Sequence, residues 1–253
     1  MYFIVEPHNQ HHVLSLMDQM FKLRARVFAD ELGWVQAQNG EERDVYDTFN
    51  PAYLMHTDPS GQHLYACVRL MPSHGPTLLA DTFADTLPDA VAFQTPLVWE
   101  ATRLCINDDL IRAHGRGHER LDILRHMLLG GLEFGVMNGV EAYLSNFDDA
   151  RLRMWRWAGA KIDVVGTTAR FGAPVHLGLM EVSVDALATL RCELGWPDAV
   201  LSKVPSLQAR APKRRTPLPP LPRKSPVISA KEPLAMSLGS TVGVGACAPN
   251  ASS

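Results

Sequence analysis

Short runs of apolar residues, separated by polar turns, divide the first 200 positions of the chain into predicted strands and helices. Runs rich in apolar and β-branched residues predict strands at 2–6, 53–56, 64–70, 97–106, 142–147, 162–165 and 175–182. Apolar residues at helical spacing predict helices at 12–32, 119–138, 148–158 and 185–194. Strands outnumber helices early and alternate with them later. This order favours a single α/β domain with a mixed central sheet flanked by helices.

Two segments between these elements show neither a helical nor a strand period. Residues 34–50 are polar, and residues 77–96 are irregular, with a short helix expected near Phe83. Loops of this length inside a compact domain usually carry function or are disordered. We therefore look for the chemistry of the protein beside the first of these segments.

The last fifth of the chain differs from the rest in composition. From residue 201 onward there are eight Lys or Arg residues, one acidic residue and nine of the 18 prolines. Such a segment has little to bury and forms helices or central strands poorly. We predict a folded domain over residues 1–200 and a disordered, basic, Pro-rich tail over residues 201–253. The remaining body then carries 16 basic and 26 acidic residues, which argues against nucleic acid as a partner.

The sequence also excludes several broad classes of protein. No stretch reaches the ~18 consecutive apolar residues that cross a bilayer, and the N-terminus lacks the regions of a secretory signal. The four cysteines are scattered, without a CxxC pair or a histidine at metal-binding spacing. We expect a cytoplasmic protein with reduced thiols, no membrane partner and no metal site.

Charged residues interrupt the predicted strand at 97–106. Glu100 and Arg103 lie in an otherwise apolar run, and a buried carboxylate is costly unless it is paired or functional. Arg112, Gly115 and Gly117 follow in the spacing Arg-x-x-Gly-x-Gly, just before a predicted helix. Glycines at this place let backbone N–H groups approach a phosphate. The segment suggests a site for a phosphate-bearing substrate, although the spacing alone is also common in ordinary loops.

A second set of charged residues lies beside aromatic residues in the first third of the chain. Its members are Arg24, Phe28, Trp34, Asp44, Asp47 and Arg69. Each alone is most simply a surface or core residue. As a set, alternating acids and arginines predict an ion-pair network around a zwitterionic substrate.

Further positions continue this pattern along the chain, namely Glu42, Phe83, Trp99, Glu100 and Arg103. In order and spacing over residues 1–190, the pattern resembles the acyl-homoserine-lactone synthases, the LuxI-type autoinducer synthases of bacterial quorum sensing. The resemblance implies an N-acetyltransferase-like fold. It also implies an acyltransferase that joins an acyl thioester to S-adenosylmethionine, closes the lactone and releases 5′-methylthioadenosine. Both reactants are substrates, and no cofactor is expected.

The resemblance implies a role for each matching residue. The catalytic set comprises Glu100, Arg69, Asp47 and Arg103. The residues that contact S-adenosylmethionine are Arg24, Phe28, Trp34, Asp44, Asp47 and Arg69. The acids are expected near the ammonium or sulfonium, while the arginines either hold the carboxylate or orient the acids. Glu100 is the candidate base, because burial raises a carboxyl pKa toward neutrality. A simple Glu100–Arg103 ion pair that holds the sheet is an equally good interpretation.

The resemblance leaves two acyl donors possible, an acyl carrier protein thioester and acyl-CoA. We favour the carrier protein because more members of the family use it. An acidic carrier protein requires a basic face. The candidates for this face lie around the helices predicted at 119–138 and 148–158, and they are Arg112, Arg116, Arg120, Arg151, Arg153 and Arg156. Arg112, Gly115 and Gly117 would hold the phosphopantetheine or diphosphate. Ser145 and Phe147 match the acyl pocket of the family, and the bulk of Phe147 suggests a short, branched or unsubstituted acyl chain.

Two other functions remain open on the sequence alone. An acetyl-CoA-dependent N-acetyltransferase of a small amine explains the turn at 112–117 and the α/β pattern. It does not explain the spacing of Trp34, Asp44 and Asp47, and it predicts no dependence on S-adenosylmethionine. A binding module that recruits a partner through its Pro-rich tail predicts no turnover, so deletion of residues 201–253 distinguishes it from an enzyme.

Overall fold

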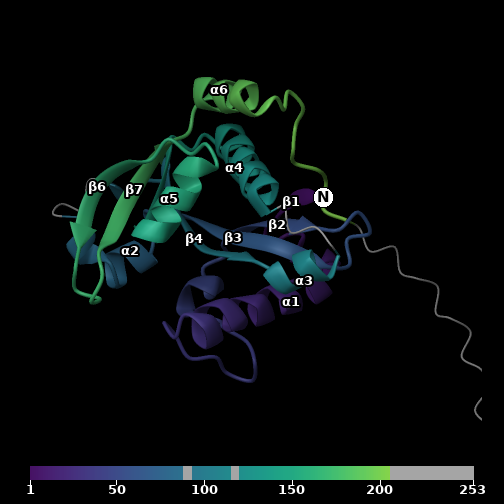
Figure 1. The fold of residues 1–253 in the computed structure, drawn as a ribbon, viewed down its shortest axis with the longest axis horizontal. Coiled ribbons are helices and arrows are strands. Elements are labelled where there is room, and N and C mark those ends of the chain that lie inside the picture. The colour runs from purple at the N-terminus through teal and green to yellow at the C-terminus, as the bar shows by residue number, and fades with distance from the viewer. Residues whose placement is uncertain (88–92, 115–119, 206–253) are drawn as a thin grey trace, which may run out of the picture. The chain divides into compact units, whose positions relative to one another are not determined.

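The computed structural model describes residues 1–87, 93–114 and 120–205. Strands in this part of the chain form one seven-stranded sheet in the order β1-β2-β3-β4-β5-β7-β6 (Figure 1). Neighbouring strands are antiparallel except β4 and β5, which run parallel. The strands are β1 (Tyr2–Val5), β2 (Ala52–Thr57), β3 (Leu64–Pro72), β4 (Val98–Ile106), β5 (Ala142–Asp148), β6 (Asp163–Thr168) and β7 (Val175–Glu181). The predicted mixed sheet is confirmed.

The helices also follow the predicted order. The α-helices are α1 (Leu14–Arg24), α2 (Leu78–Asp81), α3 (Asp108–Ala113), α4 (Arg120–Met137), α5 (Asp149–Trp157) and α6 (Val184–Leu194). The 3-10 and π-helices are η1 (Gln10–His12), η2 (Ala25–Glu31), η3 (Val45–Thr48) and η4 (Ala84–Thr86). None of the helices in the described ranges has the length and apolar content that crossing a membrane requires.

The helix predicted at 12–32 consists of α1 followed directly by η2, which is a π-helix. It ends at Glu31, and Gly33 follows two residues later with a positive φ of 63°, which suits a residue without a Cβ. Short π-helical stretches are frequent at functional sites. This one carries Phe28 and follows Arg24, two of the predicted substrate contacts.

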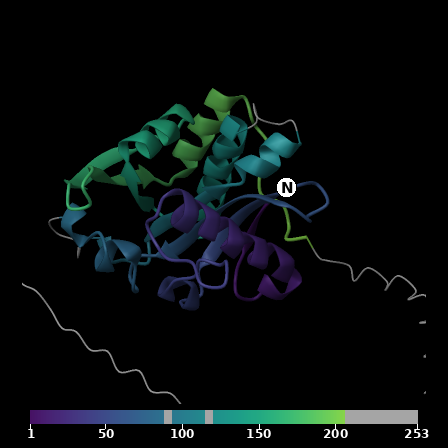
Figure 2. The same ribbon diagram turned by 60° about the horizontal axis from the view of Figure 1, so that its bottom comes forward.

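Helices cover both faces of the first half of the sheet. Side chains alternate along β2, so Tyr53 and Met55 pack on the side of α1, whereas Leu54 packs on the side of α4. Figure 1 shows α1 and α4 on opposite sides of β2 and β3, and Figure 2 brings α1 to the front. We call these two surfaces of the sheet the α1 face and the α4 face.

The parallel strands β4 and β5 form a fork. Their pairing covers Val98–Glu100 and Ala142–Leu144, although both strands continue further. The Ser145 hydroxyl donates to the Ala101 carbonyl at 2.7 Å, just past the last paired residues. Glu100 therefore lies where the two strands separate.

The irregular segment before β4 contains two short helices, α2 and η4. Thr77 caps α2, since its hydroxyl accepts the Ala80 N–H at 3.1 Å. Leu79 and Leu87 bury a small apolar cluster with Leu144 and Leu177. The segment thus covers the region of β5 and β7 beside the fork.

After α6 the chain returns to the edge strand β1. The carboxylate of Glu133 on α4 accepts the N–H groups of Val200 and Leu201, both at 2.8–2.9 Å. The Ser202 N–H donates to the Tyr2 carbonyl at 2.7 Å. Residues 201–205, which the composition assigned to the tail, therefore lie against the folded domain. The remainder of the predicted disordered tail lies outside the described residues.

Candidate active site

Strand alternation gathers polar side chains on the α1 face of the sheet. Tyr53 on β2 pairs with Arg69 on β3, and Arg69 pairs with Thr102 on β4. Glu100 lies two residues before Thr102 and therefore on the same face. Trp99 lies on the other face, where it packs against α4. The strand positions by themselves thus bring Arg69 and Glu100 to one surface.

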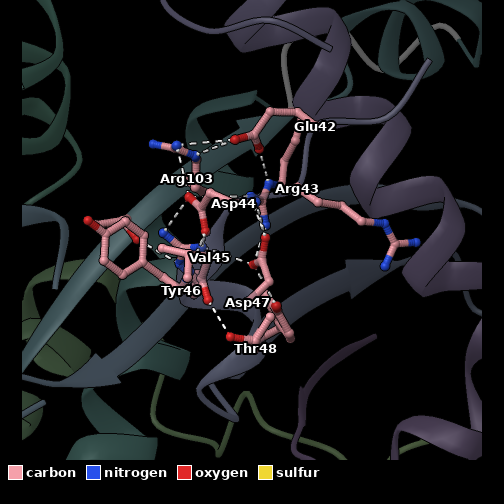
Figure 3. Close-up of polar contacts among 12 residues, drawn as sticks. Glu42, Arg43, Asp44, Val45, Tyr46, Asp47, Thr48 and Arg103 are labelled. Atoms are coloured by element: carbon pink, nitrogen blue, oxygen red, sulfur yellow. Dashed lines mark hydrogen bonds and ion pairs between the residues drawn. The ribbon is translucent and has the colours of Figure 1, made fainter. Parts of the chain in front are cut away.

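The polar segment at 34–50 lies against this face and contains the 3-10 helix η3, which Asp44 caps. The Asp44 side chain accepts the Tyr46 N–H at 3.0 Å, and the Asp47 side chain accepts the Asp44 N–H at 2.9 Å. Figure 3 shows both carboxylates on the inner side of η3, while the Arg43 side chain points away. The capping box therefore fixes the two acids that the sequence suggested.

Two arginines, from α1 and β3, bind these acids. Arg24, the last residue of α1, donates from both Nη atoms to Asp47 at 2.8 and 3.0 Å and from Nε to Glu42 at 2.6 Å. Arg69 donates to Asp47 at 2.9 Å and bridges both oxygens of Asp44. Each guanidinium thus joins two carboxylates in bidentate or bridging bonds.

A β-bulge brings a third arginine into the same network. On β4, Arg103 and Leu104 together oppose the single residue Val68 of β3. Arg103 has a φ of 57°, in the left-handed region that residues with a Cβ rarely adopt. The bulge turns Arg103 toward Glu42, at 3.2 Å from Nε, and Asp44, at 3.0 Å from Nη2 (Figure 3). Without it, alternation would place Arg103 on the α4 face.

These three arginines and three acids form what we call the ionic cluster: Arg24, Arg69, Arg103, Glu42, Asp44 and Asp47. Its formal charges cancel. Burial opposes ionisation of Arg24, but the bonds to Asp47 and Glu42 outweigh it and raise the Arg24 pKa. Burial likewise opposes ionisation of Asp47, yet the bonds from Arg24 and the charge of Arg69 hold its pKa well below the usual range. Arg24 and Asp47 therefore stay ionised at neutral pH.

Glu100 is held differently. Its side chain is buried, and its two oxygens accept the backbone N–H groups of Leu79 at 2.6 Å and Leu78 at 3.1 Å, at the start of α2. Arg103 binds Glu42 and Asp44 instead, so the alternative of a Glu100–Arg103 ion pair is wrong. Burial raises the Glu100 pKa to about 7, despite the opposing effects of the two N–H groups and the nearby arginines. Glu100 thus titrates near neutrality.

The two predicted aromatic contacts lie together at the edge of the ionic cluster. Phe28 is buried, with its ring 5.1 Å from the guanidinium carbon of Arg103. Trp34 is 57% exposed, its ring 6.1 Å from that of Phe28 and 5.1 Å from the guanidinium of Arg151 on α5. This exposed indole gives the charged site an aromatic wall.

The residues predicted for the acyl donor lie elsewhere. Arg112 is exposed and pairs with Asp109 on its own helix, while Gly115 and Gly117 lie outside the described residues. Ser145 and Phe147 follow Leu144 on β5, whose side chain packs beside Leu79 on the Glu100 side. By alternation, Ser145 and Phe147 project to the opposite face, where Phe147 belongs to the main core. They therefore lie on the face of the sheet opposite to Glu100.

Some residues that complete the site were not among the predicted contacts. Glu42 is 2% exposed and binds two arginines, although the sequence offered it only as part of the acidic pattern. The Tyr53 hydroxyl donates to Asp47 at 2.8 Å, and the Thr102 hydroxyl accepts from Arg69 Nε at 3.1 Å. Tyr53 and Thr102 had no sequence signal, because only strand register brings them to the cluster.

A sequence model of the autoinducer synthases matches residues 8–189. The chain belongs to the autoinducer synthase family. This autoinducer synthase is 31% identical over 180 residues to an acyl-homoserine-lactone synthase of Rhizobium etli, which covers 70% of the chain and 82% of the relative. It is 28% identical over 182 residues to one of Pseudomonas aeruginosa, covering 71% of the chain and 83% of the relative. The predicted acyltransferase, an acyl-homoserine-lactone synthase, is confirmed over the acetyltransferase alternative.

Solved structures of synthases share the fold of this autoinducer synthase. TofI, in a ternary complex with an inhibitor and MTA, has a TM-score of 0.57 and 26% identity, covering 75% of the chain and 96% of TofI. LasI has a TM-score of 0.65 and 22% identity, covering 75% and 93%. The CoA-dependent synthase BjaI, solved with SAM and isopentyl-CoA, has a TM-score of 0.67 and 21% identity, covering 80% and 92%.

Proposed function

We propose that this autoinducer synthase acylates the α-amine of S-adenosylmethionine with an acyl thioester and that Glu100 is the general base. The observation that supports this most is the environment of Glu100. It is a buried carboxyl with a pKa of about 7, at the fork of the sheet and on the same face as the ionic cluster. A base is most effective when its pKa lies near the operating pH.

In the first step Glu100 takes a proton from the substrate ammonium, directly or through water. The free amine then attacks the thioester carbonyl, forming the C–N bond, and the C–S bond breaks as the thiol leaves. The N–H groups of Leu78 and Leu79 fix the carboxylate while it alternates between its two protonation states. Glu100 passes this first proton to water. As the C–S bond breaks, the nitrogen loses its second proton, directly or through Glu100, to the departing thiolate, which leaves as the thiol.

In the second step the methionyl carboxylate attacks its own γ-carbon. The carbon–sulfur bond of the sulfonium breaks, and 5′-methylthioadenosine leaves with the bonding electrons. This ring closure is intramolecular, so the site needs mainly to hold the reacting atoms in position. No residue has to give or take a proton in this step.

We assign the ionic cluster to the binding of S-adenosylmethionine, with its most exposed members in contact with the substrate. Arg24 and Arg69 are 1% exposed and already bind the acids, so they orient Asp44 and Asp47. The side chains of Asp44 and Arg103 are 17% and 10% exposed. We therefore place Asp44 at a positive group of the substrate and Arg103 at its carboxylate, with Trp34 and Phe28 against the adenosyl part.

For the acyl donor, we keep the acyl carrier protein thioester as the first candidate and acyl-CoA as the second. Three arginines of the expected basic face are paired within the chain: Arg112 with Asp109, Arg120 with Asp108 and Arg151 with Asp148. These pairs reduce the field available to attract an acidic protein. Comparing kcat/KM for the two donors at low and high salt tests the choice, because only steering by a charged protein should weaken strongly with salt. The cytoplasmic location and the independence from cofactors stay predictions.

The base is tested with purified protein, S-adenosylmethionine and a panel of acyl thioesters, by following methylthioadenosine and lactone by mass spectrometry. Glu100→Gln should lower kcat by about 10²–10⁴-fold. Glu133→Gln is the control, since Glu133 is also buried and also accepts two backbone N–H groups, but it lies on α4, on the opposite face of the sheet, where it also pairs with Arg191. Turnover of Glu100→Gln within a few fold of the parent would refute the assignment.

A further inference from the structure

The short helix α2, which binds Glu100, forms hydrogen bonds to the rest of the domain at both of its ends. Its first two N–H groups donate to the Glu100 carboxylate. Its last residue, Asp81, accepts the Tyr46 hydroxyl at 2.8 Å. The position of the Glu100 donors thus depends on a contact at the opposite end of α2.

Tyr46 is itself fixed by the ionic cluster. It lies in η3 between Asp44 and Asp47, and its N–H donates to the Asp44 side chain. It is 6% exposed, and its ring lies 5.4 Å from the guanidinium carbon of Arg69. Burial and the bond to Asp81 raise the Tyr46 pKa to about 12, so its hydroxyl remains a donor over the whole working range of pH.

A helix as short as α2 depends on such contacts. It has four residues, and a single helical turn is marginal in water because nucleation is unfavourable. Within the turn, the Thr77 cap satisfies the Ala80 N–H. Leu79 packs on the small apolar cluster, but Asp81 lies on the exposed side of α2, where the bond from Tyr46 holds it.

We infer that Tyr46 is a positioning residue for Glu100, which it connects to the ionic cluster through Asp81 and α2. The inference rests on the proposed role of Glu100 as the base. Charged or titratable groups that face Glu100 are Arg69 from β3, Arg103 on β4 and Tyr46 from η3. N–H donors favour the ionised carboxylate, so a loosened α2 should make Glu100 harder to ionise.

The test is the pH profile of kcat/KM, measured as methylthioadenosine release at saturating acyl thioester. Tyr46→Phe and Asp81→Ala should each move the acidic limb to higher pH by about half a unit or more. The double variant should shift it no further, because both changes break one contact. Asp81→Asn keeps an oxygen that accepts from the Tyr46 hydroxyl, so its pH profile should match that of the parent protein. Tyr143→Phe, which removes a hydroxyl bond to Gly131 on the α4 face, is the control and should leave it unchanged.

An unshifted limb in both Tyr46→Phe and Asp81→Ala, with Glu100→Gln inactive, would overturn this inference and leave the base assignment intact. An active Glu100→Gln would remove both. Asp81 is an exposed residue, so Asp81→Ala provides the measurement if Tyr46→Phe does not fold. A fall in kcat/KM at every pH without a shift of the limb would indicate a structural role only and would also count against the inference.

Discussion

The ionic cluster and Glu100 lie on one face of the sheet but hold buried carboxylates in opposite ways. In the cluster, Glu42, Asp44 and Asp47 face the full charges of three guanidinium groups. Glu100 is bound by two backbone N–H groups, which carry only partial charges. The guanidinium charges offset the cost of burying the carboxylates of the cluster, whereas the two N–H groups offset only part of the cost of burying the Glu100 carboxylate.

This difference suits the two regions to different functions. Ion pairing keeps the pKa of Asp47 well below its usual range, so this carboxylate stays charged at any physiological pH. Incomplete compensation leaves Glu100 with a pKa of about 7, so it exchanges a proton. One region is suited to hold a charged substrate, and the other is suited to deprotonate it.

The largest expected effect comes from breaking the cluster. Arg24→Met leaves Glu42 and Asp47 short of a partner in a buried place and should destabilise the protein by about 3–5 kcal/mol. Arg112→Met removes an arginine whose pair with Asp109 is exposed and should change stability by less than ~1 kcal/mol. Urea unfolding of both variants measures the contrast, and equal losses would show that the cluster does not behave as a buried ion network.

A second prediction uses the opposite pKa shifts of Glu100 and Asp47. The Glu100 pKa is raised from 4.5 to about 7, so the folded state retains a proton that the unfolded state loses. Stability from this group should therefore fall as pH rises from 4.5 to about 7, by on the order of 3 kcal/mol. Subtracting the stability curve of Glu100→Gln from that of the parent isolates this change. A flat difference over this range would contradict the raised pKa.

The shift of Asp47 has the reverse sign. Its pKa is lowered, so its contribution is complete above the ordinary value of 3.8 and is lost as pH falls below it. The difference curve of Asp47→Asn against the parent should therefore be flat from pH 5 to 8 and change only in acid. A change near neutrality would show that the cluster also titrates there.

The smallest predicted effect concerns the edge of the cluster. Thr102→Val removes the hydroxyl that accepts from Arg69 Nε and should cost about 1 kcal/mol, since the other nitrogens of Arg69 keep their carboxylate partners. The Glu100 limb of the pH profile should stay in place. Thermal unfolding and the pH profile together check this, and a shifted limb would show that the two regions are coupled through Arg69.

Much of the fold followed from local pattern. The order of strands and the helices at α4, α5 and α6 were predictable because apolar periodicity reports which face of an element is buried. The segment at 34–50 was wrongly described as without regular structure, since it contains η3. The spacing of Asp44 and Asp47 was a capping signal that period alone does not detect.

By itself, the sequence singled out the charged residues that the structure gathers in the ionic cluster, because their order and spacing resemble those of the autoinducer synthases. It did not determine which of them pair. Arg103 reaches Glu42 because a bulge shifts the strand register, and Glu100 accepts from the amides of Leu79 and Leu78, which lie 21 and 22 residues away along the chain. Ion pairs and pKa values depend on distance and burial, and only the tertiary structure sets these for residues remote in sequence.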